Sequence, residues 1–208
     1  MKTAMPEART RLTTPDDTAQ ARAAWKRLVA RNGSLFQLAF AALWLARGTI
    51  AAGWPSRLAI AAVLAASACG LAAWGVATTQ GLAPRPRGPA ARKLDRDITI
   101  ATIAQLAVSC ALPLLLAALG RPDLTVAAIS VTIGMLLLWL RAQLGTTGHL
   151  AAGILLIVVP ITLAVALTGS ALTAAAGLVT GAILAGSAIA GFRWLAQAGP
   201  APRPGLAG

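Results

Sequence analysis

Apolar blocks alternate with short polar segments along the whole chain. A membrane-spanning helix needs about 20 apolar residues, because the hydrocarbon core is about 30 Å thick and a helix rises about 1.5 Å per residue. Six blocks reach roughly that length. They are residues 35–54, 58–79, 98–119, 124–140, 150–168 and 171–192. The pattern therefore predicts an all-α integral membrane bundle of six transmembrane helices, occupying residues 35–192.

Two polar segments flank this predicted domain. Residues 1–34 should form a cytoplasmic N-terminal tail that carries a short amphipathic helix, since Pro15 suits a first helical turn and Asp16 favours its positive end. That helix either lies on the membrane surface or simply extends the first span into the cytoplasm, and the pattern leaves both open. Residues 193–208, rich in proline and glycine, predict a disordered cytoplasmic tail.

Composition supports a membrane protein. The 208 residues are 57% hydrophobic and only 12% charged, whereas soluble domains carry about a quarter charged residues. Net charge is +12, but no interleaved aromatic and basic pattern suggests nucleic-acid binding. Lipid is therefore the expected surrounding of most of the chain.

The basic residues predict an orientation. With the N-terminus inside, all Lys and Arg are cytoplasmic except Arg47, which lies within a span, and Arg57 and Arg121, which lie outside. This asymmetry follows the positive-inside rule and places both termini in the cytoplasm. Together with the alanine- and arginine-rich composition, typical of a high-GC genome, it predicts a multi-pass protein of the bacterial cytoplasmic membrane.

Arg47 is the first candidate functional residue. It follows Leu35 by twelve positions, about 18 Å along the helix, in the outer half of the first span. Asp123 is the one acid predicted outside. Either the two pair in an outward-facing cavity, or Asp123 caps the fourth helix and Arg47 extends toward the headgroups. We favour the second interpretation.

Polar and kinking residues inside the spans offer a second candidate. Gln105 lies about two turns into the third span, and Pro113 and Pro160 lie within the third and fifth. Together they could line a polar path between helices, but such residues more often serve helix packing and bending, which we favour.

Small residues in the last span predict close helix packing. They recur at a spacing of four: Gly177 with Gly181, and Ser187 with Gly191. Cys69 and Cys110 are each expected near mid-membrane on adjacent spans, where they could touch, with no redox role required.

The sequence gives little support for catalysis or for cofactor binding. His149 and Ser187 should lie near one membrane face, but similar depth is all that relates them, and a hydrolase also needs an oxyanion hole. The chain has no HExxH, no CxxC and no phosphate-binding loop. No span carries an acid, which disfavours a carboxylate proton or sodium relay. We predict neither enzyme activity nor a metal or cofactor.

The segment Leu119–Leu124, "LGRPDL", resembles a turn in a family of small, uncharacterised bacterial multi-pass membrane proteins. In that family a glutamine-bearing span precedes Leu-Gly-x-Pro-Asp, and a span containing Ala-Ile and a glycine follows. The matching positions here are Gln105, Gly120, Pro122, Asp123, Ala128, Ile129 and Gly134. The family's histidine and proline after that glycine are missing, since this chain reads Met135 to Trp139. The resemblance covers about residues 98–168 and implies topology only, because the family has no assigned activity.

The sequence is compatible with two functions. The chain is expected to be transporter- or channel-like for a small neutral or amphipathic solute. The alternative is a non-catalytic scaffold or accessory subunit of another membrane complex. Expected partners are the lipid bilayer and either a second copy or another membrane protein.

Overall fold

The computed structural model describes residues 15–54, 56–83 and 88–199. These residues form six α-helices and one short 3₁₀ helix, and no strand occurs among them. The elements are α1 (Pro15–Ala51), α2 (Arg57–Thr78), α3 (Pro89–Ala118), η1 (Pro122–Leu124), α4 (Thr125–Leu144), α5 (Gly148–Ala166) and α6 (Gly169–Ala198). All six α-helices are long and apolar enough to cross a membrane. The predicted all-α architecture with six membrane-length helices is confirmed.

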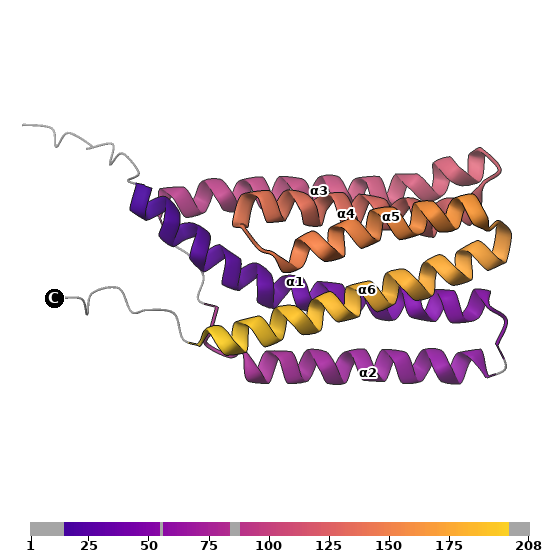
Figure 1. Cartoon of the computed structure of the whole chain (residues 1–208), viewed down its shortest axis with the longest axis horizontal. Coiled ribbons are helices and arrows are strands. Elements are labelled where there is room, and N and C mark those ends of the chain that lie inside the picture. Colours follow the sequence, from indigo (N-terminus) through magenta and orange to yellow (C-terminus); the bar gives the residue numbers. More distant parts are fainter. Residues whose placement is uncertain (1–14, 55, 84–87, 200–208) are drawn as a thin grey trace, which may run out of the picture.

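The helices lie side by side along one long axis (Figure 1). The α1–α6 pair is the most extensive contact, followed by α4–α5. Helix α2 packs mainly on α1, and α3 packs mainly on α4, so α2 and α3 lie on opposite sides of the bundle (Figure 1). Neither outer helix buries much of its most apolar segment, which is 6% buried in α2 and 0% in α3. Both therefore present long apolar surfaces to their surroundings.

Glycines set the distance between α1 and α6. A Cβ atom placed on Gly177 would lie 2.9 Å from the Gly48 Cα and from the Trp44 carbonyl oxygen, and one on Gly181 would lie 2.9 Å from the Ala41 carbonyl oxygen. The two backbones are thus in direct contact, as small residues permit in membrane helices.

Of the residues predicted for helix packing, three face α1. Gly177 and Gly181 do so through the contacts above, and Gly191 does so because a Cβ on it would overlap the Ser34 side chain. Ser187 is half-buried on α6. Nearby, the fully buried Phe192 ring lies against Gly75 of α2 and makes an edge-on contact with Trp74. The glycine contacts join α6 to α1, and Phe192 joins it to α2.

Several helices extend beyond the predicted spans. The segment expected as a separate amphipathic helix continues into the first span, so α1 is one helix of 37 residues. Likewise α3 begins at Pro89 rather than residue 98, and residues 193–198 belong to α6 rather than to a tail. The flanks are rich in alanine, arginine and leucine, which favour helix whether or not lipid surrounds them. Residues 1–14 and 200–208 of the two predicted tails lie outside the described part of the chain.

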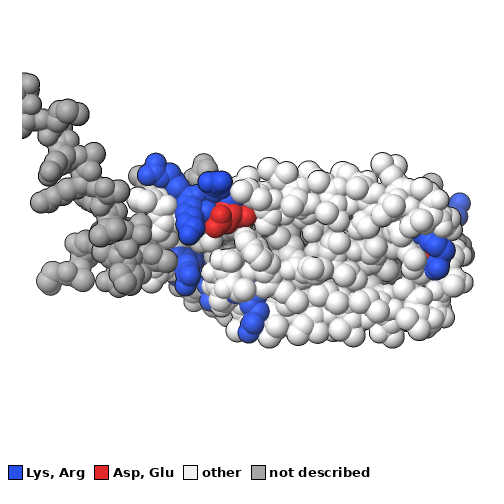
Figure 2. Space-filling view, turned by 90° about the horizontal axis from the view of Figure 1, so that it is seen from above, with Lys and Arg blue, Asp and Glu red and all other residues white. Residues whose placement is uncertain are grey.

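Charged side chains gather at the two ends of the bundle, and the face seen in Figure 2 is free of them in between. The end at which α1 and α3 begin and α6 ends carries most of the cations and is called the basic end below. It holds Arg22, Lys26, Arg27, Arg31, Arg92, Lys93, Arg96, Arg141 and Arg193. The uncharged body between the two ends is what a membrane-spanning bundle requires.

Candidate functional site

Asp123 connects two turns at the end opposite the basic end. Its carboxylate accepts a hydrogen bond from Arg121 Nε at 3.2 Å and another from the backbone N–H of Gly169 at 3.1 Å. Gly169 is the first residue of α6. A carboxylate at a helix N-terminus satisfies a free amide and complements the helix dipole. Asp123 therefore caps α6, a distant element, and makes no side-chain cap on α4.

Arg47 does not pair with Asp123. It is exposed on α1, four residues before that helix ends. Within the part of the chain that the structure describes, the single ion pair is Arg121–Asp123. The pairing interpretation was therefore wrong, because Arg121 lies two residues from Asp123 and reaches it locally. An exposed arginine near a helix end is placed to extend toward lipid headgroups, as the alternative interpretation proposed.

Gln105 joins α3 to α4. Its Nε2 atom donates to Thr132 Oγ1 at 2.8 Å and to Ser109 Oγ at 3.1 Å. The Thr132 hydroxyl in turn donates to the Ile129 carbonyl oxygen of its own helix. The side chain thus serves helix packing, the interpretation that the sequence favoured.

A second polar contact, which the sequence analysis missed, joins α4 to α6. Ser130 Oγ and Thr180 Oγ1 lie 2.7 Å apart, and both residues are fully buried. Ser130 and Thr132 point in nearly opposite directions, since two positions span about 200° of a helix. Hydroxyl residues on both faces of an apolar span were the available signal that α4 lies between two other helices.

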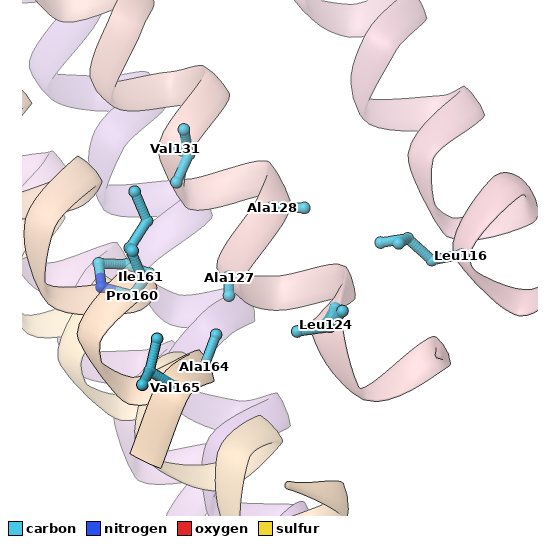
Figure 3. A pocket seen from close by; sticks show the side chains of 9 residues that line it. All are labelled: Leu116, Leu124, Ala127, Ala128, Val131, Pro160, Ile161, Ala164 and Val165. Atoms are coloured by element: carbon cyan, nitrogen blue, oxygen red, sulfur yellow. The ribbon is translucent and has the colours of Figure 1, made fainter. Parts of the chain in front are cut away.

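An apolar groove of about 280 Å³ lies between α3, α4 and α5. Figure 3 shows Leu116 reaching from α3 toward the side chains of α4 and α5. The groove is lined by Leu116, Leu124, Ala127, Ala128, Val131, Pro160, Ile161, Ala164 and Val165. Pro160 lines it, but Gln105 and Pro113 do not, and every lining residue is apolar. The polar path considered for these three residues is not formed here.

Three consecutive side chains of α1 bind other helices at the basic end. Trp25 Nε1 donates to the Ala91 carbonyl oxygen of α3 at 3.2 Å, and Lys26 Nζ to the Gly145 carbonyl oxygen after α4 at 3.4 Å. Arg27 donates to the carbonyl oxygens of Ala198 and Gly199 at the end of α6. Cations at helix C-termini satisfy free carbonyls and complement the dipole.

The remaining candidates do not assemble into a reactive centre in the described residues. No hydrogen bond joins His149 to Ser187, and the buried His149 Nε2 atom has no partner. Cys69 and Cys110 are exposed thiols on α2 and α3, at opposite sides of the bundle (Figure 1), so they do not touch. No three His, Cys, Asp or Glu side chains of residues 15–54, 56–83 and 88–199 gather as metal ligands.

No protein-family model, no curated protein and no solved structure matches the chain. The resemblance of residues 98–168 to a family of small membrane proteins therefore stays a prediction.

Proposed function

We propose that the protein is a non-enzymatic, multi-pass protein of the bacterial cytoplasmic membrane, transporter-like, that takes an apolar or amphipathic molecule from the lipid phase. The groove between α3, α4 and α5 carries this proposal, because it is lined by apolar residues alone. Since it lies between membrane-length helices, a ligand reaches it sideways from the bilayer.

The interior polar contacts argue against a polar solute. The hydroxyls of Ser130 and Thr180 bind each other, and the amide N–H of Gln105 binds Ser109 and Thr132. A path for a polar molecule needs polar groups that line a cavity and are free to bind it. These side chains instead hold neighbouring helices together.

The size of the groove suggests its occupant. Pockets that enclose whole small molecules measure about 300–1,000 Å³, and this groove reaches only about 280 Å³. It therefore suits a single hydrocarbon chain, with the rest of an amphipathic molecule left in the bilayer or at its surface.

A photoactivatable fatty acid tests this assignment in nanodiscs. We expect mass spectrometry to find crosslinks at α3–α5 groove peptides, and Ala128→Phe, which fills the groove, to reduce them at least tenfold. The control Ala107→Phe adds the same bulk to an exposed position of α3 and should leave them unchanged. Equal labelling of all three proteins contradicts the proposal. Stimulated flux of a fluorescent fatty acid in proteoliposomes then separates transport from binding alone.

The orientation has its own test. In a Cys69→Ala, Cys110→Ala background, a membrane-impermeant maleimide applied to spheroplasts should label Ser170→Cys, at the start of α6. Thr147→Cys, in the turn between α4 and α5, should react only after lysis. Both positions are exposed. The reverse pattern contradicts the proposed orientation.

A scaffold function is the second candidate, and α2 favours it. Helical spacing places one run of small residues on a single exposed face: Ala59, Ala62, Ala66, Gly70, Ala73 and Ala77. A Cβ on Gly70 would meet nothing within 4 Å. Such faces allow another membrane helix to approach closely.

A bulky substitution on this face tests the scaffold function. Gly70→Leu should abolish a homodimer, or co-purification of a stoichiometric partner, in mild detergent. The control Ala104→Leu, exposed on α3, should not. A wild-type protein that is monomeric and without a partner contradicts this candidate.

A further inference from the structure

We propose that the outer face of α3 binds an anionic phospholipid, with the phosphate at Arg92 and Arg96 and one acyl chain along the apolar residues that follow. This α3 lipid stripe consists of Arg92, Arg96, Ile100, Ile103 and Leu114. None of these residues lines the groove, so the site stands apart from the proposed function.

Helical geometry places the stripe on one face. The first four members are three or four residues apart, and Leu114 follows Ile103 by about three whole turns. The five side chains therefore emerge within a narrow sector of the helix. All five are exposed. Ile100, Ile103 and Leu114 are 53%, 62% and 75% exposed, high values for large apolar side chains. No other helix of the described chain covers this face.

The chemistry along the stripe follows that of a lipid. Two guanidinium groups begin it at the basic end, where the apolar body starts, and purely apolar side chains continue it into the body. Guanidinium groups bind phosphate oxygens through paired hydrogen bonds. A headgroup phosphate and an acyl chain have the same order along the membrane normal.

The charges of the stripe are free to act on a ligand. Asp95 and Asp97 are the nearest acids in sequence, but each lies about 100° around the helix from Arg96 and is half-buried. No ion pair joins either aspartate to Arg92 or Arg96 among the described residues. By contrast, Lys26 and Arg27 at the same end are engaged by backbone carbonyls.

An anionic lipid accounts for these features better than an acidic protein does. The cations lie next to the exposed apolar residues of a membrane-length helix, at the level that headgroups occupy. Clusters of basic residues at this level attract anionic lipids, and each cation near the surface strengthens binding about fivefold. An acidic soluble partner would complement the arginines but leave Ile100 and Ile103 unexplained.

The experiment measures the thermal stability of the detergent-solubilised protein with added lipid. Phosphatidylglycerol should raise the melting temperature, and phosphatidylcholine and inorganic phosphate should not. The double variant Arg92→Gln, Arg96→Gln should bind phosphatidylglycerol about thirtyfold more weakly. The control Arg141→Gln, Arg193→Gln removes two other exposed cations at the basic end and should retain the wild-type response.

Four outcomes overturn the proposal. Phosphatidylcholine or inorganic phosphate could raise the melting temperature as much as phosphatidylglycerol does, or the Arg92, Arg96 variant could respond to phosphatidylglycerol like the wild type. The control variant could also lose its response to the same extent, which would show a diffuse charge effect. Tighter binding of poly-glutamate than of phosphatidylglycerol through the same two arginines would assign the site to an acidic protein. Unfolding without lipid and size-exclusion profiles verify that both variants are folded.

Discussion

Because Gly177 has no side chain, the backbones of α1 and α6 can approach closely at this position. A Cβ there would lie 2.9 Å from backbone atoms of α1, and backbone cannot move aside as a flexible side chain can. We expect Gly177→Ala to destabilise the protein by about 1–3 kcal/mol, the usual cost of overpacking. Thermal unfolding in detergent measures it.

Gly186 of α6 provides the matched control. It is exposed, and a Cβ there would meet nothing within 4 Å. Gly186→Ala should therefore be neutral or stabilise the helix by up to about 1 kcal/mol. Equal effects of the two substitutions would show that the close approach of α1 and α6 is not what constrains Gly177.

Arg47 and Asp123 should behave as independent residues. Arg47→Leu is expected to be neutral or stabilising, because an exposed arginine is replaced by an apolar side chain near lipid. Asp123→Asn should lower the melting temperature, because it weakens the bonds to Arg121 and Gly169. In the double variant the two effects should add. A double variant no worse than one single variant would show that the two side chains are coupled in the membrane.

This pair also shows what the sequence could and could not predict about a site. Counting charges placed Arg47, Arg121 and Asp123 toward one end of the bundle, where the structure has them. Which cation reaches the carboxylate depends on the local turn at η1 and on side-chain directions, and neither is encoded in hydropathy. The hydrogen bond from the Gly169 amide to Asp123 could not be predicted either, because the two residues are 46 positions apart in the sequence.

Among the helices, α4 occupies the connecting position. Its Ser130 binds Thr180 of α6, and its Thr132 accepts a hydrogen bond from Gln105 of α3. A double-mutant cycle with Ser130→Ala and Thr180→Val should give a coupling free energy of about 0.6 kcal/mol, and at most about 1.7, as for other hydrogen bonds between membrane helices.

Thr162→Val is the control for that cycle. The Thr162 hydroxyl is exposed and donates only to the Val158 carbonyl oxygen of its own helix. Its removal should neither change stability much nor couple to Thr180→Val. A coupling free energy of zero for the Ser130–Thr180 pair would mean that each hydroxyl finds another partner when the first is lost.

The number of helices was predictable and their ends were not. Hydropathy reports where lipid contacts the chain, so the six apolar blocks were found. It does not report where the helical backbone stops, and α1, α3 and α6 each continue into polar sequence that favours helix. Hydropathy also does not report how each helix is rotated about its axis, so the contact between Ser130 and Thr180 could not be predicted.

At the scale of the whole molecule, the pairing of helices was the least predictable feature. Short connections make α4 and α5 neighbours, but no connection brings α1 to α6. The sequence identified Gly177, Gly181 and Gly191 as a packing face without indicating the helix that covers it. That partner follows only from the arrangement of all six helices.

The pairing of α1 with α6 predicts that a shortened chain is unstable. A chain ending at residue 168 keeps five membrane-length helices but loses the most extensive contact of α1. Pulse-chase labelling should show faster degradation of this chain than of the full chain. Co-expression of residues 169–208 as a separate segment should restore its half-life. An unchanged half-life of the shortened chain would contradict the importance assigned to this contact.

The order of synthesis determines when α1 and α6 can pair. Of the six described helices, α1 leaves the ribosome first and α6 last, so the most extensive interface forms only after α6 has been made. During that interval the glycine and serine face of α1 meets lipid or the insertion machinery in place of its partner. Synthesis of α1 and its pairing with α6 are therefore separate events in time, and the rate at which the later helices are translated sets how long this face of α1 lacks its partner.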